Sequence, residues 1–351
     1  MMLSIKTSKA AILFKSHHPL IVDEIILPTQ LQYGQVLVEL IRSGICGTQI
    51  NEIDEAKGPD QFFPHLLGHE GFARVLEIGP GVQTVSPNDF VVMHWRAGSG
   101  IQSEPAVYQW DGRKLNSGWV TTFSNHSIVS ENRVTKVTPN LFELNIYPLL
   151  GCALTTSLGV LNNDAKVKSS DTLLIFGCGG IGLLLIKLAK VLGIKNIVAV
   201  DINKDKLVYA KKFGASSIIK YTDKTNTLVQ LKNVFRNDLP SVAIETSGNS
   251  EAIELCYELS APAARVILVG VPRLGSLAKI YTLPLHLGKV LKGSYGGESH
   301  PDVDIPEMIE LISKGILNLN DYPTHMFKLD EINDAIIKLR SGTPGRIVLN
   351  F

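Results

Sequence analysis

At 351 residues the chain is long enough for two domains, and its 45% share of hydrophobic residues allows each a substantial core. The formal net charge of +1 argues against the broad basic surface of proteins that bind nucleic acid or anionic membranes. The first apolar run covers only residues 10–14, and no run approaches about 18 apolar residues, so neither a signal peptide nor a membrane span is expected.

The first third of the chain is expected to be rich in β-strands. Short apolar runs at 11–14, 36–41, 73–78 and 90–94 are separated by turn signals, a pattern that predicts a barrel-like β fold. The polar, glycine-rich segment 96–118 is predicted to be a long loop, and 120–129 to be a further strand.

Strands and helices alternate in the second part of the chain, after a helical segment at 153–160. The alternation predicts a doubly wound α/β domain with a parallel sheet. The expected strands are 172–176, 197–200, a strand before Glu245, and 266–271, and the expected helices are 181–191, 204–213 and 250–259. Helices near 305–314 and 329–341 and a last strand at 346–351 are predicted to close the chain.

A glycine-rich turn between the strand at 172–176 and the next helix has the pattern of a dinucleotide-binding loop. Gly177, Gly179 and Gly182 form G-x-G-x-x-G, which allows a tight turn, close approach to a pyrophosphate and close helix packing. Asp201 lies nineteen residues after Gly182, where it can accept hydrogen bonds from a ribose and would repel a 2′-phosphate. The unit predicts NAD rather than NADP, and a generic tight turn is the alternative for the glycines alone.

The four cysteines lie far apart and form no C-x-x-C pair, which is typical of a reducing compartment and predicts a cytoplasmic location. Cys46, His69 and Cys152 together offer two thiolates and one imidazole, a set that suits a catalytic zinc with a fourth position for water or substrate. Their spacing matches no compact zinc finger. From spacing alone, buried cysteines acting as small hydrophobic residues and a surface His69–Glu70 pair stay open.

Several segments together resemble the zinc-dependent alcohol dehydrogenases of the medium-chain dehydrogenase/reductase family. These are GICGT, GHEG, GCALTTSLG, GCGGIG and VDINKDK, followed by VILVGVP, LKGSYGG and RIVLNF, so the resemblance covers nearly the whole chain. It implies an α/β protein with a GroES-like, partly open β-barrel catalytic domain at residues 1–154 and 296–351. It also implies an NAD-binding Rossmann domain, with a doubly wound parallel sheet, at 155–295.

The resemblance also implies roles for single residues. Cys46, His69 and Cys152 would hold one catalytic zinc, with Glu70 a carboxylate close to the metal and Thr48 the hydroxyl beside the substrate. The residues implied in cofactor binding are Gly177, Gly179, Gly180, Ile181, Gly182, Asp201, Lys206 and Arg346. The implied reaction is reversible hydride transfer between NAD and a simple, polyol or sugar-linked alcohol. The implied assembly is a homodimer or homotetramer that pairs edge strands of the cofactor domains, and the strand 266–271 is apolar enough to do so.

The chain departs from the family pattern at four places. Residues 94–118 contain no cysteine, so no structural zinc is expected. The unusual lobe at residues 94–100 is either a packed loop that replaces the zinc lobe or a substrate-contacting loop. Gln49 replaces an aspartate that orients the zinc-bound histidine in many relatives, and its neutral amide can accept the same hydrogen bond but adds no charge. Asn51 replaces a histidine that relays a proton in some relatives, so the relay beyond Thr48 stays open.

Two alternative functions follow from these departures and from the fold. A zinc-free NAD(P)-dependent enone or quinone reductase could share the fold, but it would not need the three ligand-type residues. A non-catalytic NAD-binding protein would tolerate Gln49 and Asn51. Zinc content measured together with turnover distinguishes the three possibilities.

Overall fold

The computed structural model describes residues 3–139, 144–236 and 238–351, which form two compact units. The first unit comprises Met1–Thr155, His300–Ser341 and Arg346–Phe351, and the second comprises Thr156–Ser299 and Gly342–Gly345. Within the described ranges, no helix has both the length and the apolar character needed to cross a bilayer.

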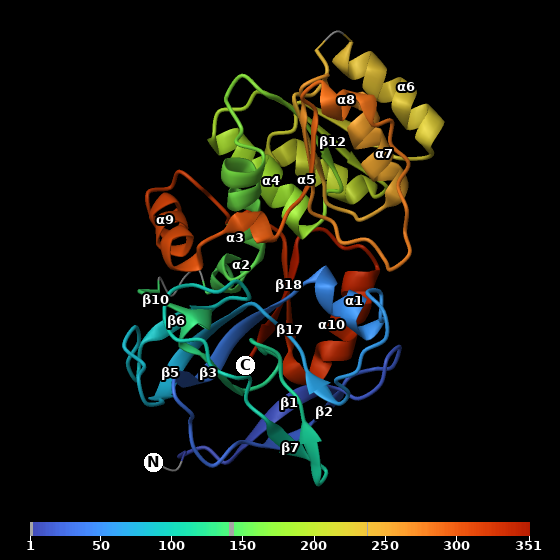
Figure 1. The fold of residues 1–351 in the computed structure, drawn as a ribbon. Coiled ribbons are helices and arrows are strands. Elements are labelled where there is room, and N and C mark those ends of the chain that lie inside the picture. Colours follow the sequence, from blue (N-terminus) through green and yellow to red (C-terminus); the bar gives the residue numbers. More distant parts are fainter. Residues whose placement is uncertain (1–2, 140–143, 237) are drawn as a thin grey trace. The chain divides into compact units, whose positions relative to one another are not determined.

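Two mainly antiparallel sheets form the first unit (Figure 1). One has the strand order β4-β1-β2-β7-β8, and the other has the order β10-β6-β5-β3-β18-β17, with β9 also paired to β3. The strands are β1 (Thr7–Leu13), β2 (Ile21–Ile26), β3 (Gln35–Ile45), β4 (His65–Leu66), β5 (Gly71–Ile78), β6 (Phe90–Met93), β7 (Tyr108–Trp110), β8 (Arg113–Leu115), β9 (His126–Ser130), β10 (Val134–Val137), β17 (Thr324–Lys328) and β18 (Arg346–Asn350).

The two sheets share a hydrophobic core, because each strand turns alternate side chains to the same face. One buried cluster includes Ile12 of β1, Leu37 of β3, Tyr108 of β7 and Ile128 of β9. The predicted β-rich, barrel-like domain is therefore confirmed. The helices of this unit are α1 (Gly47–Ile53), η1 (Glu131–Arg133), α2 (Tyr147–Leu150), α9 (Pro301–Ser313), η5 (Leu329–Glu331) and α10 (Ile332–Arg340), and α3 (Ala153–Gly159) leads into the second unit.

Strands from opposite ends of the chain lie side by side in the larger sheet. Figure 1 shows the red β18 beside the blue β3, and the antiparallel register places Ile347 opposite Ile45. The residue before Ile347 is Arg346, and the residue after Ile45 is Cys46. The last strand therefore brings Arg346 close to Cys46.

The second unit contains a six-stranded parallel sheet with the order β13-β12-β11-β14-β15-β16. The chain order reverses beside the central strand β11, which is the switch point where α/β sheets bind ligands. The predicted doubly wound fold is confirmed. The elements are η3 (Val160–Asp164), β11 (Thr172–Phe176), α4 (Gly180–Val191), β12 (Asn196–Asp201), α5 (Lys204–Phe213), β13 (Ser217–Lys220), α6 (Lys224–Phe235), β14 (Val242–Glu245), α7 (Ser250–Leu259), β15 (Arg265–Leu268), α8 (Leu283–His286), β16 (Val290–Gly293) and η4 (Gly296–Glu298).

The structure corrects two predictions about local elements. The segment 96–118 is not one long loop, because β7 and β8 form a hairpin inside it. The hairpin turn is Asp111-Gly112, and both residues have positive φ, as a two-residue turn of this kind requires. In the predicted strand 120–129, the regular strand begins only at His126, as β9, and Ser124 before it makes an isolated bridge with Ala10.

Candidate functional site

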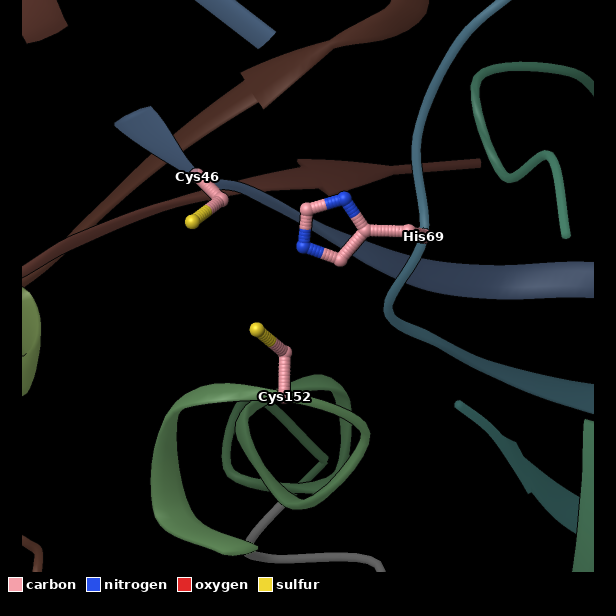
Figure 2. Close-up of side chains that lie close together, drawn as sticks. All are labelled: Cys46, His69 and Cys152. Carbon is pink, nitrogen blue, oxygen red and sulfur yellow. The ribbon is translucent and has the colours of Figure 1, made fainter. Parts of the chain in front are cut away.

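Three elements of the first unit bring Cys46, His69 and Cys152 together (Figure 2). Cys46 follows β3, His69 precedes β5, and Cys152 lies between α2 and α3. The ligand atoms of the three side chains all lie within 4.8 Å of one another. Because β3 and β5 are antiparallel neighbours, the end of one and the beginning of the other meet at the same edge of the sheet.

Close packing of the backbone places Cys152 at this edge. A Cβ atom at Gly151 would lie 2.1 Å from the carbonyl oxygen of Met93, the last residue of β6. Only glycine allows the turn that carries Cys152 to approach the sheet so closely.

The two thiols and the imidazole form one electrostatic unit. A hydrogen bond from the Cys152 thiol lowers the pKa of Cys46 well below its ordinary value, with help from Arg346 and His69. The same hydrogen bond, together with burial, raises the pKa of Cys152 well above its ordinary value. Burial opposes a charged His69 ring, but contacts with Cys46 and nearby carboxylates leave the pKa of His69 raised.

These donors fit a zinc ion. The lowered pKa of the buried Cys46 favours its thiolate form, and a second sulfur and a ring nitrogen face this sulfur. Two thiolates and one imidazole are common ligands of zinc, and metal binding replaces the protons that these groups carry. The set provides three protein ligands, which leaves room for a water or substrate oxygen.

Gln49 connects two members of the group through its side-chain amide. Its Oε1 accepts a hydrogen bond from the backbone N–H of Cys46 at 2.9 Å, and its Nε2 lies 2.7 Å from Nδ1 of His69. The amide is able to accept a hydrogen bond from His69, but in the structure its nitrogen, not its oxygen, faces the ring. The single amide oxygen is already used by Cys46, so the NH₂ group faces His69 and donates.

Glu70 and Arg346 form a buried ion pair beside the group. Oε1 of Glu70 accepts from Nε of Arg346 at 2.8 Å and from Nη2 at 2.5 Å. Oε2 of Glu70 accepts no hydrogen bond from any residue the structure describes. Burial raises the pKa of Glu70, although Arg346 opposes that change. The metal role of Glu70 and the pyrophosphate role of Arg346 remain predictions.

Two further side chains near the group were not predicted from the sequence. Burial raises the pKa of Glu52, and its carboxylate also interacts electrostatically with His69 and Cys46. Burial raises the pKa of Tyr322, and its phenol also interacts electrostatically with Arg346 and Glu70. Glu52 lies four residues after Thr48 on α1. A sequence-based prediction of that helix would therefore have placed the side chains of Thr48 and Glu52 on one face.

The predicted cofactor residues of the second unit gather at the end of β11 and β12. Gly177 has a φ of +95°. A Cβ atom at Gly182 would lie 1.9 Å from the Gly177 carbonyl oxygen, so the turn requires glycine there. Gly179 is the N-cap of α4, which Gly180 and Ile181 begin, so the positive end of the helix dipole lies at the turn.

Asp201 ends β12 next to this turn. Its Oδ2 accepts from the backbone N–H of Cys178 at 2.7 Å, and its Oδ1 accepts from that of Asn203 at 2.8 Å. The carboxylate is thus held in one orientation by the glycine turn and by the beginning of α5. Lys206 lies in the first turn of α5 and is half-buried.

Comparisons with known proteins agree with this architecture. Residues 32–139 match the family described as alcohol dehydrogenase GroES-like domain, and residues 180–314 match the zinc-binding dehydrogenase family. The chain is 29% identical to S-(hydroxymethyl)glutathione dehydrogenase of Escherichia coli O1:K1, over 98% of this chain and 100% of that protein. It is also similar to the crystal structure of benzyl alcohol dehydrogenase from Acinetobacter calcoaceticus, with a TM-score of 0.87 and 25% identity over 99% and 100% of the two chains.

Proposed function

Because the chain belongs to the zinc-dependent alcohol dehydrogenases of the medium-chain dehydrogenase/reductase family, we propose that Cys46, His69 and Cys152 hold its catalytic zinc. The observation that carries this proposal is the meeting of three ligand atoms within 4.8 Å from three separate elements. The enzyme is an alcohol oxidoreductase, and hydride passes between the carbinol carbon of its substrate and NAD.

The residues around the metal position have distinct roles in this reaction. Zinc, when bound, supplies Lewis-acid polarisation that lowers the pKa of an alcohol hydroxyl. Thr48 is half-buried, and its Oγ1 lies 3.8 Å from the Cys46 sulfur, which supports it as the group that accepts the hydroxyl proton. The buried positions of Cys46 and Cys152 restrict access of water to the centre.

The second unit is proposed to bind NAD through Gly177, Gly179, Gly180, Ile181 and Gly182. The N-terminus of α4 offers backbone N–H groups and positive dipole potential to a pyrophosphate. The oriented carboxylate of Asp201 favours ribose hydroxyls and repels a 2′-phosphate, which supports NAD over NADP. Lys206 is the proposed second ribose contact, and Arg346 the proposed pyrophosphate contact.

The proposed assembly is a homodimer, or a pair of such dimers, formed through the edge strand β16. The strand predicted for this pairing, 266–271, is not an edge, because β15 lies between β14 and β16. β16 is the last strand in the sheet order, and its first residue, Val290, is exposed. Other exposed apolar side chains precede it: Leu274, Leu277, Tyr281, Leu283 and Leu287. An unpaired strand edge that follows a segment with several exposed apolar side chains is typical of a surface covered in an oligomer.

Zinc content and turnover measured together test the proposed function. The expected result is one zinc per chain and NAD reduction that is lost on chelation and restored by zinc. The alcohols to be tested are simple alcohols, polyols, benzyl alcohol and S-(hydroxymethyl)glutathione. Cys46→Ser should lose zinc and turnover, and Cys256→Ala should keep both, since Cys256 is a buried free thiol of the second unit. Turnover by zinc-free protein would contradict the proposal.

A further inference from the structure

The side chain of Gln49 is held by the N-terminal cap of α1. Cys46 is the N-cap residue and Gln49 is the third residue of the helix, and together they form a capping box. The amide oxygen accepts the Cys46 N–H at 2.9 Å, and Gln49 is only 1% exposed. A buried backbone N–H needs an acceptor, and the amide oxygen provides it here.

The same amide faces the ring of His69. An amide has one acceptor oxygen and one donor NH₂ group, so the 2.7 Å contact with Nδ1 is a donation from Gln49. Reversing the amide would not help, because the NH₂ group would then face the Cys46 N–H, and two donors would meet. A carboxylate has no such conflict, because both of its oxygens accept.

This hydrogen bond selects a tautomer of the imidazole. A neutral ring has one protonated and one accepting nitrogen, so an accepting Nδ1 places the proton on Nε2. Figure 2 shows that the second ring nitrogen faces the sulfur atoms of Cys46 and Cys152. A metal at this position needs the lone pair of that nitrogen, and the Gln49 contact favours the tautomer in which the nitrogen carries a proton.

We propose that Gln49 is a positioning residue that opposes metal loading and makes the centre of this chain weaker and faster to exchange zinc than its carboxylate counterpart. To bind a metal through Nε2, the ring must move its proton to Nδ1. Gln49 must then turn its oxygen to the ring, which leaves the Cys46 N–H without its cap. This inference rests on the proposed zinc centre and concerns how readily that centre is filled.

The variant Gln49→Glu tests the inference, because it keeps the side-chain length and replaces the NH₂ group with a second acceptor. Zinc affinity is measured by competition with a chromophoric chelator, and zinc release by transfer to excess chelator. Residues that hydrogen-bond to a metal-binding histidine change metal affinity by about 10- to 100-fold. We expect Gln49→Glu to bind zinc more tightly by about that factor and to release it more slowly.

A charge-matched variant separates hydrogen-bond polarity from simple attraction of the cation. Glu52 lies on the same helix and interacts electrostatically with His69 and Cys46. The double variant Gln49→Glu/Glu52→Gln keeps the number of carboxyl groups on α1 and still offers an acceptor to Nδ1. The gain in zinc affinity should persist in the double variant. If it disappears, charge alone explains the gain and the inference is wrong.

The tautomer of His69 gives a readout that does not involve the metal. In zinc-free wild type, nitrogen chemical shifts should show His69 protonated on Nε2, and in Gln49→Glu they should show a proton on Nδ1. A wild-type ring protonated only on Nδ1 would overturn the inference, as would equal zinc affinities. Absence of zinc binding in both proteins would instead refute the proposed zinc centre, so the two failures are distinguishable.

Discussion

His94 is a histidine whose pKa is lowered chiefly by burial. It is 1% exposed, its Nδ1 donates to the Arg96 carbonyl at 2.7 Å, and its Nε2 lies 2.9 Å from Oγ1 of Thr135. Burial lowers the pKa of His94 from 6.5 to about 4. Both ring nitrogens are satisfied within the first unit, which favours the interpretation of the segment after β6 as packed structure.

The lowered pKa of His94 predicts a loss of stability in mild acid. The unfolded chain binds a proton on this residue below about pH 6.5, and the folded chain binds it only near about pH 4. Between about pH 6.5 and pH 5, zinc-free wild type should lose roughly 2 kcal/mol more free energy of unfolding than His94→Gln. Urea unfolding at several pH values measures this difference. A slope in His94→Gln equal to that of wild type would contradict the assignment.

At the scale of elements, a carboxylate organises the segment that precedes the β7–β8 hairpin. Oε1 of Glu131 accepts from the backbone N–H groups of Gln83 and Thr84 at 2.6 and 2.8 Å, and Oε2 accepts from that of Ile101 at 2.9 Å. These contacts hold the pKa of Glu131 below its ordinary value, against the effect of burial. Glu131 thus joins three parts of the first unit: its own segment, residues 83–84 and residue 101. The segment 94–118 is held by this carboxylate and contains no cysteine that could bind a structural zinc.

Replacing Glu131 by glutamine should loosen this segment. The amide keeps one acceptor, and its NH₂ group meets a backbone N–H that then lacks a partner, at a cost of about 1–3 kcal/mol. Urea unfolding should show that loss, and limited proteolysis should cut near Gly98–Gly100 sooner than in wild type. The matched control is Glu104→Gln, an exposed carboxylate in the same segment. Unchanged stability and proteolysis of Glu131→Gln would refute the role of Glu131.

At the scale of the whole molecule, the exposed edge of the parallel sheet predicts self-association. Leu287 is 68% exposed in the apolar segment before β16. Leu287→Asp places a charge in the proposed interface, so it should shift the protein from dimer to monomer in light scattering at micromolar concentration. NAD binding should persist in the monomer, because the glycine turn is distant in sequence and unchanged.

A control on the other unit makes this test specific. Ile337 of α10 is 64% exposed in the first unit, so Ile337→Asp introduces the same charge outside the proposed interface. It should leave the oligomeric state unchanged. A Leu287→Asp protein with the mass of wild type, or a monomeric wild type, would contradict pairing through β16.

Local sequence pattern was sufficient to predict much of the fold of this protein. The β11–turn–α4–β12 unit is contiguous, so the glycines and Asp201 could be identified from their spacing. The β-rich first part and the alternating second part follow from hydrophobic periodicity. The β7–β8 hairpin was missed although Asp111-Gly112 marks its turn, because three-residue strands give almost no periodic signal.

The sequence by itself determined the fold class, the dinucleotide turn and the residue types that a zinc centre needs, because each depends on short-range pattern or on chemical identity. Only the tertiary structure decided that Cys46, His69 and Cys152 meet, since strand pairing and the close approach at Gly151 bring distant segments together. It also decided the direction of the hydrogen bond from Gln49. That direction depends on which donors surround one buried amide oxygen, and no spacing along the chain contains this information.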